Sequence, residues 1–213
     1  MVGAGRFISF EGGEGAGKST QVARLVERLR AHGIESLSTR EPGGTPNAEA
    51  LRKVLLEGLQ EQLSAASEAM IFSAARIDHL DKLIRPALKR GAYVVCDRFA
   101  DSTRAYQGGA LGAAFIDGLE ALTVGATMPD LTFILDLPAE EGLKRADLRR
   151  GSGKVDRFES ETIDFHRGLR TAFAQIAKNN PQRCIIVDAT RNIDTIADDI
   201  WRLVETRLLK AQL

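Results

Sequence analysis

The sequence predicts an α/β fold in which a doubly wound, five-stranded parallel sheet carries helices on both faces. Short apolar runs alternate with segments of helical periodicity throughout the 213 residues, which is typical of strands buried on both faces. A Gly-rich stretch joins the first apolar run to the first helical segment. No linker, internal repeat or low-complexity segment divides the chain. We therefore expect residues 1–213 to form a single domain.

Five apolar runs are expected to form the strands. They lie at residues 7–10, 35–39, 93–96, 131–137 and 184–187. The second run is the weakest, and it leads into a turn-rich loop at residues 40–46. Because the carboxyl ends of parallel strands meet at one edge of a sheet, ligands should bind at that edge.

Helices are expected between these strands and after the last one. Periodicity and terminal residues place them at about 18–32, 48–58, 79–90, 113–125, 139–150, 159–178 and from 193 onward. Asn47 is the expected N-cap of the helix from residue 48, and Ser64 or Ser67 caps a further helix that carries Phe72 and Arg76. The polar segment 99–111 is dense in hydrogen-bonding groups, which a capped short helix with a glycine exit could explain without any function.

The composition indicates a soluble globular protein. Apolar residues make up 44% and charged residues 27% of the chain, and 29 basic residues balance 29 acidic ones. No overall basic field exists for nucleic acid or an anionic membrane, so we expect neither as a partner. Cys96 and Cys184 lie in apolar runs without metal-binding spacing and are expected to be reduced. Without a signal-like stretch or an apolar run of about 18 residues, the expected location is cytoplasmic.

Residues 12–19 carry the phosphate-binding pattern G-x-x-x-x-G-K-[ST] between a strand and a helix, as the pattern requires. The glycines let the backbone approach a ligand, and the N–H groups of the loop and helix start attract a polyphosphate. Lys18 would place its charge on the β and γ phosphates, and the Ser19 hydroxyl can bind Mg²⁺. The triphosphate contacts expected from this stretch are Gly12, Gly13, Glu14, Gly15, Ala16, Gly17, Lys18, Ser19 and Thr20.

Two residue pairs suggest further parts of a site. Asp97 ends a strand near the phosphate-binding loop, where a carboxylate is a natural partner for Mg²⁺, and the neighbouring Arg98 could turn toward a second phosphate. Phe72 and Arg76 are four residues apart in a helix and could offer a base an aromatic face and a bidentate donor. The alternative for Asp97 and Arg98 is an ordinary ion pair at a strand end. The alternative for Phe72 and Arg76 is that Phe72 packs in the core and Arg76 is a surface charge.

A cluster of arginines precedes a glycine-rich break. Arg145, Arg149 and Arg150 lie at the end of a predicted helix, before Gly151-Ser152-Gly153. This arrangement suits a short lid at about 145–157, whose guanidinium groups would reach a transferring phosphoryl and exclude water. The alternative is a solvated helix end whose positive charge complements the helix dipole.

Together these residues resemble the thymidylate kinases of the bacterial type. The matching stretches are Phe10–Thr20, Thr39–Thr45, Asp97–Phe99, Ser102–Gly108, Pro129-Asp130, Leu143–Arg145 and Asp156–Glu159. They span nearly the whole chain. The phosphate-binding loop is generic to many NTPases, whereas the second stretch and the run from Asp97 to Gly108 are far more specific.

The resemblance implies a P-loop kinase that transfers a phosphoryl group from ATP to dTMP with Mg²⁺, in dTTP synthesis, and that forms a homodimer. It implies that Phe72 stacks on thymine, that Arg76 contacts its exocyclic oxygen and that Tyr106 lies near the sugar C2′. The full dTMP set is Glu14, Pro42, Phe72, Arg76, Arg98, Ser102, Thr103, Tyr106 and Gln107. The catalytic set is Lys18, Arg98, Arg149 and Arg150; Arg145 and Arg191 extend the ATP site; Ser19 and Asp97 hold the metal.

A physical argument favours a nucleoside monophosphate as the acceptor. A phosphate acceptor is already anionic near neutral pH, so no general base is needed, and none of the three histidines has a partner at a suitable spacing. Three alternatives stay open. They are a kinase for another (deoxy)nucleoside monophosphate, a deoxynucleoside kinase with Glu11 or Glu14 as its base, and a nucleotide-binding switch module. The chain lacks the Asn-Lys-x-Asp stretch of GTPases.

Overall fold

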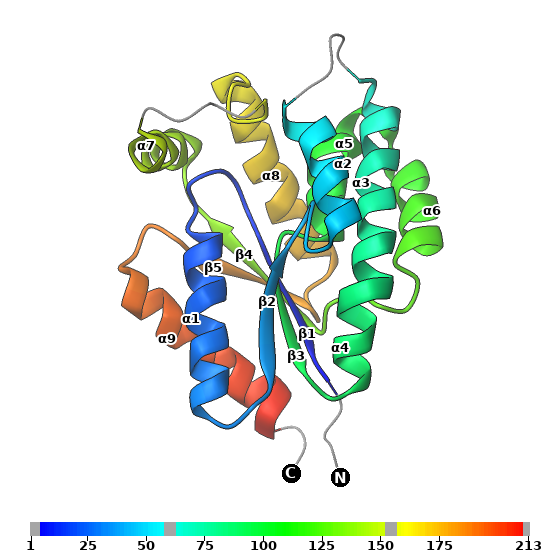
Figure 1. Ribbon diagram of the computed structural model, residues 1–213. Coiled ribbons are helices and arrows are strands. Elements are labelled where there is room, and N and C mark those ends of the chain that lie inside the picture. Colours follow the sequence, from blue (N-terminus) through cyan, green and yellow to red (C-terminus); the bar gives the residue numbers. More distant parts are fainter. Residues whose placement is uncertain (1–4, 58–62, 152–156, 211–213) are drawn as a thin grey trace.

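A single sheet of five parallel strands forms the centre of the computed structural model, which describes residues 5–57, 63–151 and 157–210 (Figure 1). The strands are β1 (Phe7–Glu11), β2 (Ser36–Arg40), β3 (Tyr93–Asp97), β4 (Leu131–Asp136) and β5 (Cys184–Asp188). Their spatial order is β2-β3-β1-β4-β5. This confirms the predicted α/β fold, and it places the first strand, with its Gly-rich exit, in the middle of the sheet.

Helices connect consecutive strands, as parallel pairing requires. They are α1 (Lys18–Ala31), α2 (Pro46–Glu57), α3 (Ala65–His79), α4 (Arg85–Lys89), α5 (Ala100–Leu111), α6 (Ala113–Thr123), α7 (Ala139–Arg150), α8 (Ile163–Asn179) and α9 (Ile193–Val204). Two π-helical segments, Leu80–Ile84 and Glu205–Leu209, continue α3 and α9.

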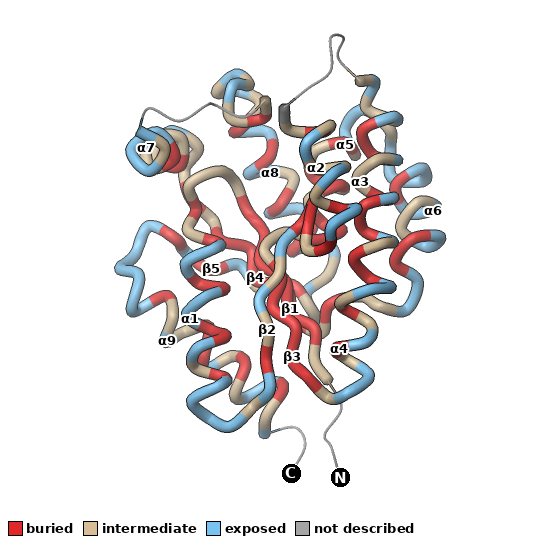
Figure 2. The backbone as a smooth tube through the Cα atoms, viewed as in Figure 1, coloured by how far each residue is buried: buried red, intermediate tan, exposed pale blue. Residues whose placement is uncertain are grey.

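Both faces of the sheet are covered (Figures 1 and 2). Ile8 and Phe10 point to one face and pack with residues of α1 and α9, including Leu25. Phe7 points to the opposite face and packs with Ile84. The three central strands β1, β3 and β4 are almost wholly buried, whereas the edge strands β2 and β5 are partly exposed (Figure 2). Burial on both faces explains why the central strands read as apolar runs and why the second run is the weakest.

The register aligns the strand ends that carry the chemistry. Phe10 of β1 lies opposite Asp97 of β3, and Arg40 of β2 lies opposite the same residue. The loops that follow these three strands therefore leave the sheet at the same edge. Buried strands cannot shift their register without exposing apolar side chains, so this alignment is fixed by the core.

The prediction that Asn47 caps α2 is wrong. The helix begins at Pro46, and Thr45 Oγ1 accepts a hydrogen bond of 3.2 Å from the N–H of Ala48. Proline suits the first helical position because its missing N–H would have no partner there. The Asn47 amide instead donates to Asp78 at 3.0 Å. Residue 58, the predicted end of this helix, lies outside the described residues.

Other helix boundaries differ from the prediction in two places. Ser64 caps α3 by accepting from the N–H of Ser67 at 3.1 Å, as one alternative foresaw. The helix expected at 79–90 is no separate element, because α3 continues through the π segment into α4. The helix expected from residue 159 begins at Ile163, and Thr162 Oγ1 accepts from the N–H of Phe165 at 3.3 Å. Residues 100–111 do form a helix.

The predicted lid is described only at its two ends. Helix α7 runs to Arg150, and Gly151 follows with a left-handed φ of 57°. The chain is described again from Arg157, in turns that lead to α8. Residues 152–156, with most of the predicted glycine break, lie outside the described residues.

Two further expectations concern the cysteines and the membrane. Cys96 and Cys184 are buried free thiols, as predicted. Among the described residues, no helix combines the length and the apolar character that crossing a bilayer would need.

Candidate active site

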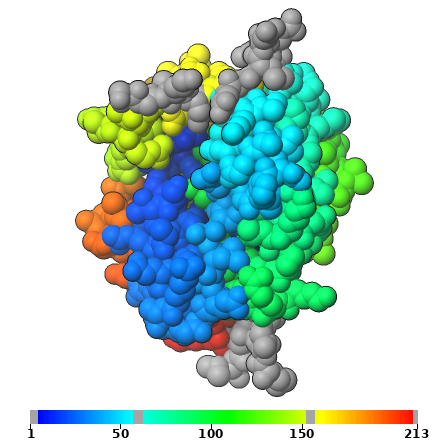
Figure 3. Space-filling view, viewed as in Figure 1, coloured from blue at the N-terminus to red at the C-terminus, as the bar shows by residue number. Residues whose placement is uncertain are grey.

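A cavity of about 400 Å³ opens at the carboxyl edge of the sheet. The loops after β1, β2 and β3 line it, together with α2, α3 and α5. In the space-filling view, dark blue atoms from the N-terminal part of the chain are visible in a recess between α7 and α2 (Figure 3). Sixteen of the predicted site residues line the cavity: Glu14, Gly15, Gly17, Lys18, Ser19, Thr20, Pro42, Phe72, Arg76, Asp97, Arg98, Ser102, Thr103, Tyr106, Gln107 and Arg149.

The phosphate-binding loop wraps around the ammonium group of Lys18. Its Nζ donates to the carbonyl oxygens of Gly12 at 3.1 Å and Gly13 at 2.7 Å. Gly17 has a left-handed φ of 91° directly before α1 begins, a conformation that glycine adopts without steric cost. The loop therefore presents its N–H groups and the start of α1 toward the cavity, which is the arrangement that binds anions.

The loop also makes a close backbone contact with α7. A Cβ atom on Gly15 would lie 2.0 Å from the carbonyl oxygen of Gly142, and one on Gly142 would lie 2.3 Å from that of Glu14. Neither position can hold a side chain without moving the other backbone. Two glycines, one in each segment, thus let α7 sit directly on the loop.

Ser19 and Asp97 converge at the floor of the cavity. The Ser19 hydroxyl donates to Asp97 Oδ2 at 2.5 Å. A hydroxyl and a carboxylate are hard oxygen donors of the kind Mg²⁺ prefers, and Mg²⁺ usually takes its other ligands from waters and phosphates. The pair therefore fits a metal held jointly with a triphosphate. Among the described residues, no group of three or more His, Cys, Asp or Glu side chains could hold a metal by itself.

Arg98 turns its side chain back over the phosphate-binding loop. Its φ is 68°, the one positive value for a non-glycine residue in the described part of the chain. The guanidinium donates to the carbonyl oxygen of Gly12 at 3.2 Å, forms an ion pair with Glu14, and lies 5.3 Å from the centroid of the Tyr106 ring. The strained backbone brings the side chain from the strand end into the cavity.

The charges in this part of the cavity depend on one another. Burial raises the pKa of Glu14, but the charges of Arg98 and Lys18 and a hydrogen bond from Tyr106 outweigh burial and hold the pKa at about 2. Burial and the charge of Arg98 lower the pKa of Lys18. Glu14 is therefore a carboxylate at neutral pH and a poor proton acceptor.

Glu11 lies beneath the cavity, fully buried, and does not line it. Its Oε1 accepts from the N–H of Phe99 at 2.7 Å, and its Oε2 accepts from the Ser102 hydroxyl at 2.6 Å. Burial and the neighbouring Asp101 raise its pKa to about 8. Glu11 thus joins the end of β1 to the start of α5 and holds the turn that contains Arg98.

Arg76 belongs to a buried polar network rather than to the surface. Its Nε donates to Glu41 at 2.7 Å, and its Nη2 donates to Thr103 Oγ1 at 2.9 Å. Glu41 also contacts His79 Nδ1 at 3.1 Å. His79, to which the sequence assigned no role, is fully buried in this network. The interpretation of Arg76 as a surface charge is therefore wrong.

Three aromatic rings surround one part of the cavity. The Phe158 ring centroid lies 6.2 Å from that of Phe72 and 5.2 Å from that of Tyr106. Phe158 was not predicted as a site residue, although it stands in a stretch that carries the family resemblance. The cavity-lining residues that sequence reasoning did not assign are Arg40, Glu41, Arg52, Leu56, Phe99, Phe158 and Glu159. Arg52 and Leu56 had no signal beyond the helical spacing of α2.

Some predicted site residues lie outside the cavity lining. Gly12, Gly13 and Ala16 belong to the loop but do not line the cavity. Arg145 donates to the carbonyl oxygen of Ala189 at 3.1 Å, and Arg191 donates to that of Asp188 at 3.3 Å. These two arginines are therefore brought together at the turn after β5.

The two predicted lid arginines differ in their surroundings. Arg149 lines the cavity, with its Nη2 3.5 Å from a carboxylate oxygen of Glu159. Arg150 does not line the cavity. Its Nη1 donates to Glu159 Oε2 at 2.6 Å, and its guanidinium also forms an ion pair with Asp147. Of the two, Arg149 is placed to meet a ligand in the cavity.

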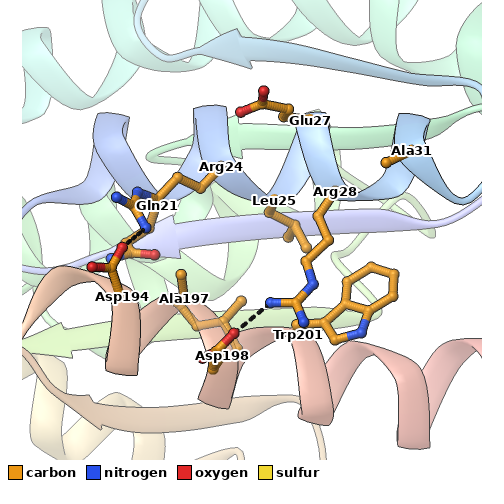
Figure 4. Close-up of a pocket in the computed structure, with 11 residues that line it drawn as sticks. Gln21, Arg24, Leu25, Glu27, Arg28, Ala31, Asp194, Ala197, Asp198 and Trp201 are labelled. Atoms are coloured by element: carbon orange, nitrogen blue, oxygen red, sulfur yellow. Dashed lines mark hydrogen bonds and ion pairs between the residues drawn. The ribbon is translucent and has the colours of Figure 1, made fainter.

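A second cavity, of about 360 Å³, lies between α1 and α9 (Figure 4). Arg24 pairs with Asp194 at 2.5 Å, and Arg28 pairs with Asp198 at 2.6 Å while lying over the Trp201 ring. No predicted site residue lines this cavity. Its arginines are already neutralised by carboxylates, so it offers no free charge for a phosphate.

Comparisons with known proteins agree with the geometry. The sequence model of the thymidylate kinase family matches residues 10–200. A thymidylate kinase of Rhodopseudomonas palustris is 56% identical over 97% of this chain and 91% of its own length, and one of Bradyrhizobium diazoefficiens is 52% identical over 97% and 92%. The crystal structure of thymidylate kinase from Ehrlichia chaffeensis superposes with a TM-score of 0.74, at 32% identity, over 94% of this chain and 99% of that one.

Proposed function

The chain belongs to the thymidylate kinase family and is a dTMP kinase, and from this premise we propose that it transfers the γ-phosphoryl group of ATP directly to the phosphate of dTMP, with Mg²⁺ bound. One observation carries this proposal. A single cavity holds both the phosphate-binding loop and the side chains predicted for the acceptor. Donor and acceptor phosphates would therefore meet within it, as in-line transfer requires.

The phosphates would be bound by the loop and by two cations, Lys18 and Arg98. Lys18 already faces the cavity beside the loop carbonyls, where it would reach the β and γ phosphates of ATP. Arg98 donates to the same Gly12 carbonyl oxygen as Lys18 and lies beside Glu14 and Tyr106, where the acceptor phosphate would enter. Arg149 would meet the transferring group from α7. Positive charge placed in advance around the phosphoryl group supplies most of the catalysis in reactions of this kind.

Mg²⁺ would be held by Ser19 and Asp97 together with phosphate oxygens. Their 2.5 Å contact means that both oxygens already point to one place. The ion would neutralise charge on the donor phosphates.

The two carboxylates that could act as a general base, Glu11 and Glu14, favour a nucleoside monophosphate over a nucleoside as the acceptor. A nucleoside hydroxyl needs a base to take its proton. Glu14, with its pKa near 2, is a poor base. Glu11 has a pKa of about 8, but both of its oxygens are occupied by donors and it does not line the cavity. A monophosphate needs no base, because its phosphate is already ionised.

The acceptor nucleoside would occupy the aromatic part of the cavity. Phe72 would stack on the base, and Arg76, fixed by Glu41 and Thr103, would donate to an exocyclic oxygen. Tyr106 would lie beside the sugar and crowd a 2′-hydroxyl. Glu14 would face the 3′ side of the sugar, and Pro42 would border the site.

The remaining ATP contacts would lie at the turn after β5. Arg145 and Arg191 would flank the adenine there, since both already contact this turn. The chain would act as one domain, with the segment at about 145–157 as its lid, in the cytoplasm.

We also propose a homodimer formed through α3 and α6. Four large apolar side chains are exposed on these two helices: Met70, Ile77, Phe115 and Leu122. Exposed apolar residues gathered on neighbouring helices typically mark an interface. Residues 79–90 fit an interface less well, because Leu80 and Ile84 are fully buried. Light scattering of wild type and Leu122→Asp should give a dimer and a monomer, and a monomeric wild type would reject the interface.

The function is tested with a coupled assay of ADP release. ATP, Mg²⁺ and the wild-type protein are combined with dTMP, dUMP, dCMP, AMP or thymidine, and the rates are compared. A strong rate with dTMP and little with thymidine or AMP is expected. Equal rates without any acceptor would mean simple hydrolysis and would overturn the proposal. Omitting Mg²⁺ should abolish the rate.

A further inference from the structure

Glu68 of α3 is a buried carboxylate that receives two donors beside the cavity. The guanidinium of Arg157 forms an ion pair with its Oε1. The amide Nε2 of Gln107, from α5, donates to its Oε2 at 3.3 Å. Glu68 and Gln107 are only 7% and 2% exposed. Glu68 does not line the cavity, whereas Gln107 does.

This contact determines how the Gln107 amide is oriented. A carboxylate only accepts hydrogen bonds, so the NH₂ end of the amide must face Glu68. The carbonyl end, Oε1, is then turned away and has no hydrogen-bond partner among the described residues, although it is buried. A buried acceptor without a partner is unfavourable. A ligand that supplies a donor at this position would satisfy it.

Arg157 fixes the position of the Glu68 carboxylate. Its guanidinium only donates hydrogen bonds and pairs with Oε1 of Glu68, so Oε2 is the oxygen left for the Gln107 amide. The Arg157 guanidinium carbon also lies 4.6 Å from the centroid of the Phe158 ring, which borders the same cavity. Arg157 and Phe158, which follow the predicted lid, are thereby attached to α3 at Glu68, the same residue that Gln107 contacts.

We propose that Glu68, held by Arg157, is a positioning residue that selects acceptor bases carrying a ring N–H, by fixing the Gln107 amide with its oxygen available to the base. This inference rests on the proposed function and concerns the same cavity. Thymine and uracil carry a donor at N3, whereas cytosine carries an acceptor there. A fixed carbonyl oxygen pairs with the first two and repels the third. An amide free to rotate would accept both.

The test replaces Glu68 by glutamine. The Glu68→Gln side chain has nearly the same shape but can donate as well as accept, so the Gln107 amide is free to turn. The ratio of kcat/KM for dTMP to that for dCMP should fall by about tenfold or more. Most of the change should lie in the KM values of the two acceptors, and the KM for ATP should stay unchanged.

Three further variants separate positioning from general damage. Glu120→Gln is the matched control, because Glu120 also pairs with an arginine, Arg104 at 2.9 Å, but does not line the cavity. It should leave the ratio unchanged. Arg157→Ala should lower the ratio, and Arg157→Lys, which keeps the positive charge, should largely restore it. In a Gln107→Leu background, Glu68→Gln should cause no further change in the ratio.

The outcomes are distinguishable from failure of the proposed function. If wild type does not phosphorylate dTMP, the proposed function fails. If wild type uses dTMP and Glu68→Gln or Arg157→Ala weakens all acceptors equally, the selection by Glu68 is refuted. If Glu68→Gln does not fold, the Arg157 and Gln107 variants decide by the same ratio.

Discussion

Arg98 combines a strained backbone with a proposed phosphate contact, and replacing it tests both features. Its φ of 68° disfavours every residue with a Cβ. Its guanidinium contacts Gly12 and Glu14 at the edge of the phosphate-binding loop. Arg98→Ala removes the guanidinium and keeps the strain. Arg98→Gly removes both, and Arg98→Lys keeps a positive charge without the bidentate geometry.

The expected magnitudes follow from these contacts. Loss of one charged donor that faces the reacting phosphates should lower kcat/KM for dTMP by about 10²- to 10³-fold, equally in the alanine and glycine variants. The glycine variant should be more stable than the alanine variant by about 1–2 kcal/mol, because a left-handed backbone costs an L-residue roughly that amount. The lysine variant should keep part of the activity.

Two measurements decide the outcome. Steady-state kinetics with dTMP report the role of the guanidinium, and urea denaturation of all three variants reports the strain. Wild-type-like turnover in Arg98→Ala would refute the assignment of Arg98 to the acceptor phosphate. A glycine variant no more stable than the alanine variant would refute the strain argument while leaving the chemical role intact.

Three further predictions concern the surroundings of the site. Gly142→Ala should raise the KM for ATP by about tenfold, because its Cβ would lie 2.3 Å from the carbonyl oxygen of Glu14 and would displace the phosphate-binding loop. Gly118→Ala is the control: its Cβ would meet open space, and the KM for ATP should stay unchanged. Glu41→Ala should lower the free energy of unfolding by about 3–5 kcal/mol, since it leaves the buried charge of Arg76 unpaired; a loss below about 1 kcal/mol in urea denaturation would contradict this. The pKa of Glu14 is held at about 2, below its ordinary 4.5, so the stability that its charge contributes is present above pH 4.5 and is lost as the pH falls toward 2. Glu14→Gln should therefore reduce the slope of unfolding free energy against pH between these two values. An unchanged slope would argue against the ion pair with Arg98.

The fold was accessible from the sequence because local patterns and tertiary structure agree. Buried parallel strands read as apolar runs, and the α1 face shows its helical spacing directly. The boundaries failed where two signals competed. Asn47 is a good cap by residue type, but Thr45-Pro46 begins the helix two residues earlier. The sequence predicted a separate helix at 79–90, whereas the π segment Leu80–Ile84 joins α3 to α4 without interruption. Helical spacing alone does not distinguish one long helix from two shorter helices in succession.

The site was predictable where residue types and their spacing alone indicate a chemical function. Glycines, a lysine and a serine at fixed spacing, between a predicted strand and a predicted helix, indicate a phosphate-binding loop before the tertiary fold is known. Partners brought together by topology were not predictable in this way. His79 and Glu68 lie on a helix far in sequence from Glu41 and Arg157, and only packing reveals that they form buried contacts.

The central claim is that one cavity holds donor and acceptor in line for direct phosphoryl transfer. The stereochemical course at phosphorus tests this most directly. ATP whose γ-phosphorus is chiral through three oxygen isotopes is turned over with dTMP, and the configuration of the product is determined. Direct in-line transfer predicts inversion. Retention would require a phosphorylated protein intermediate and would contradict the account.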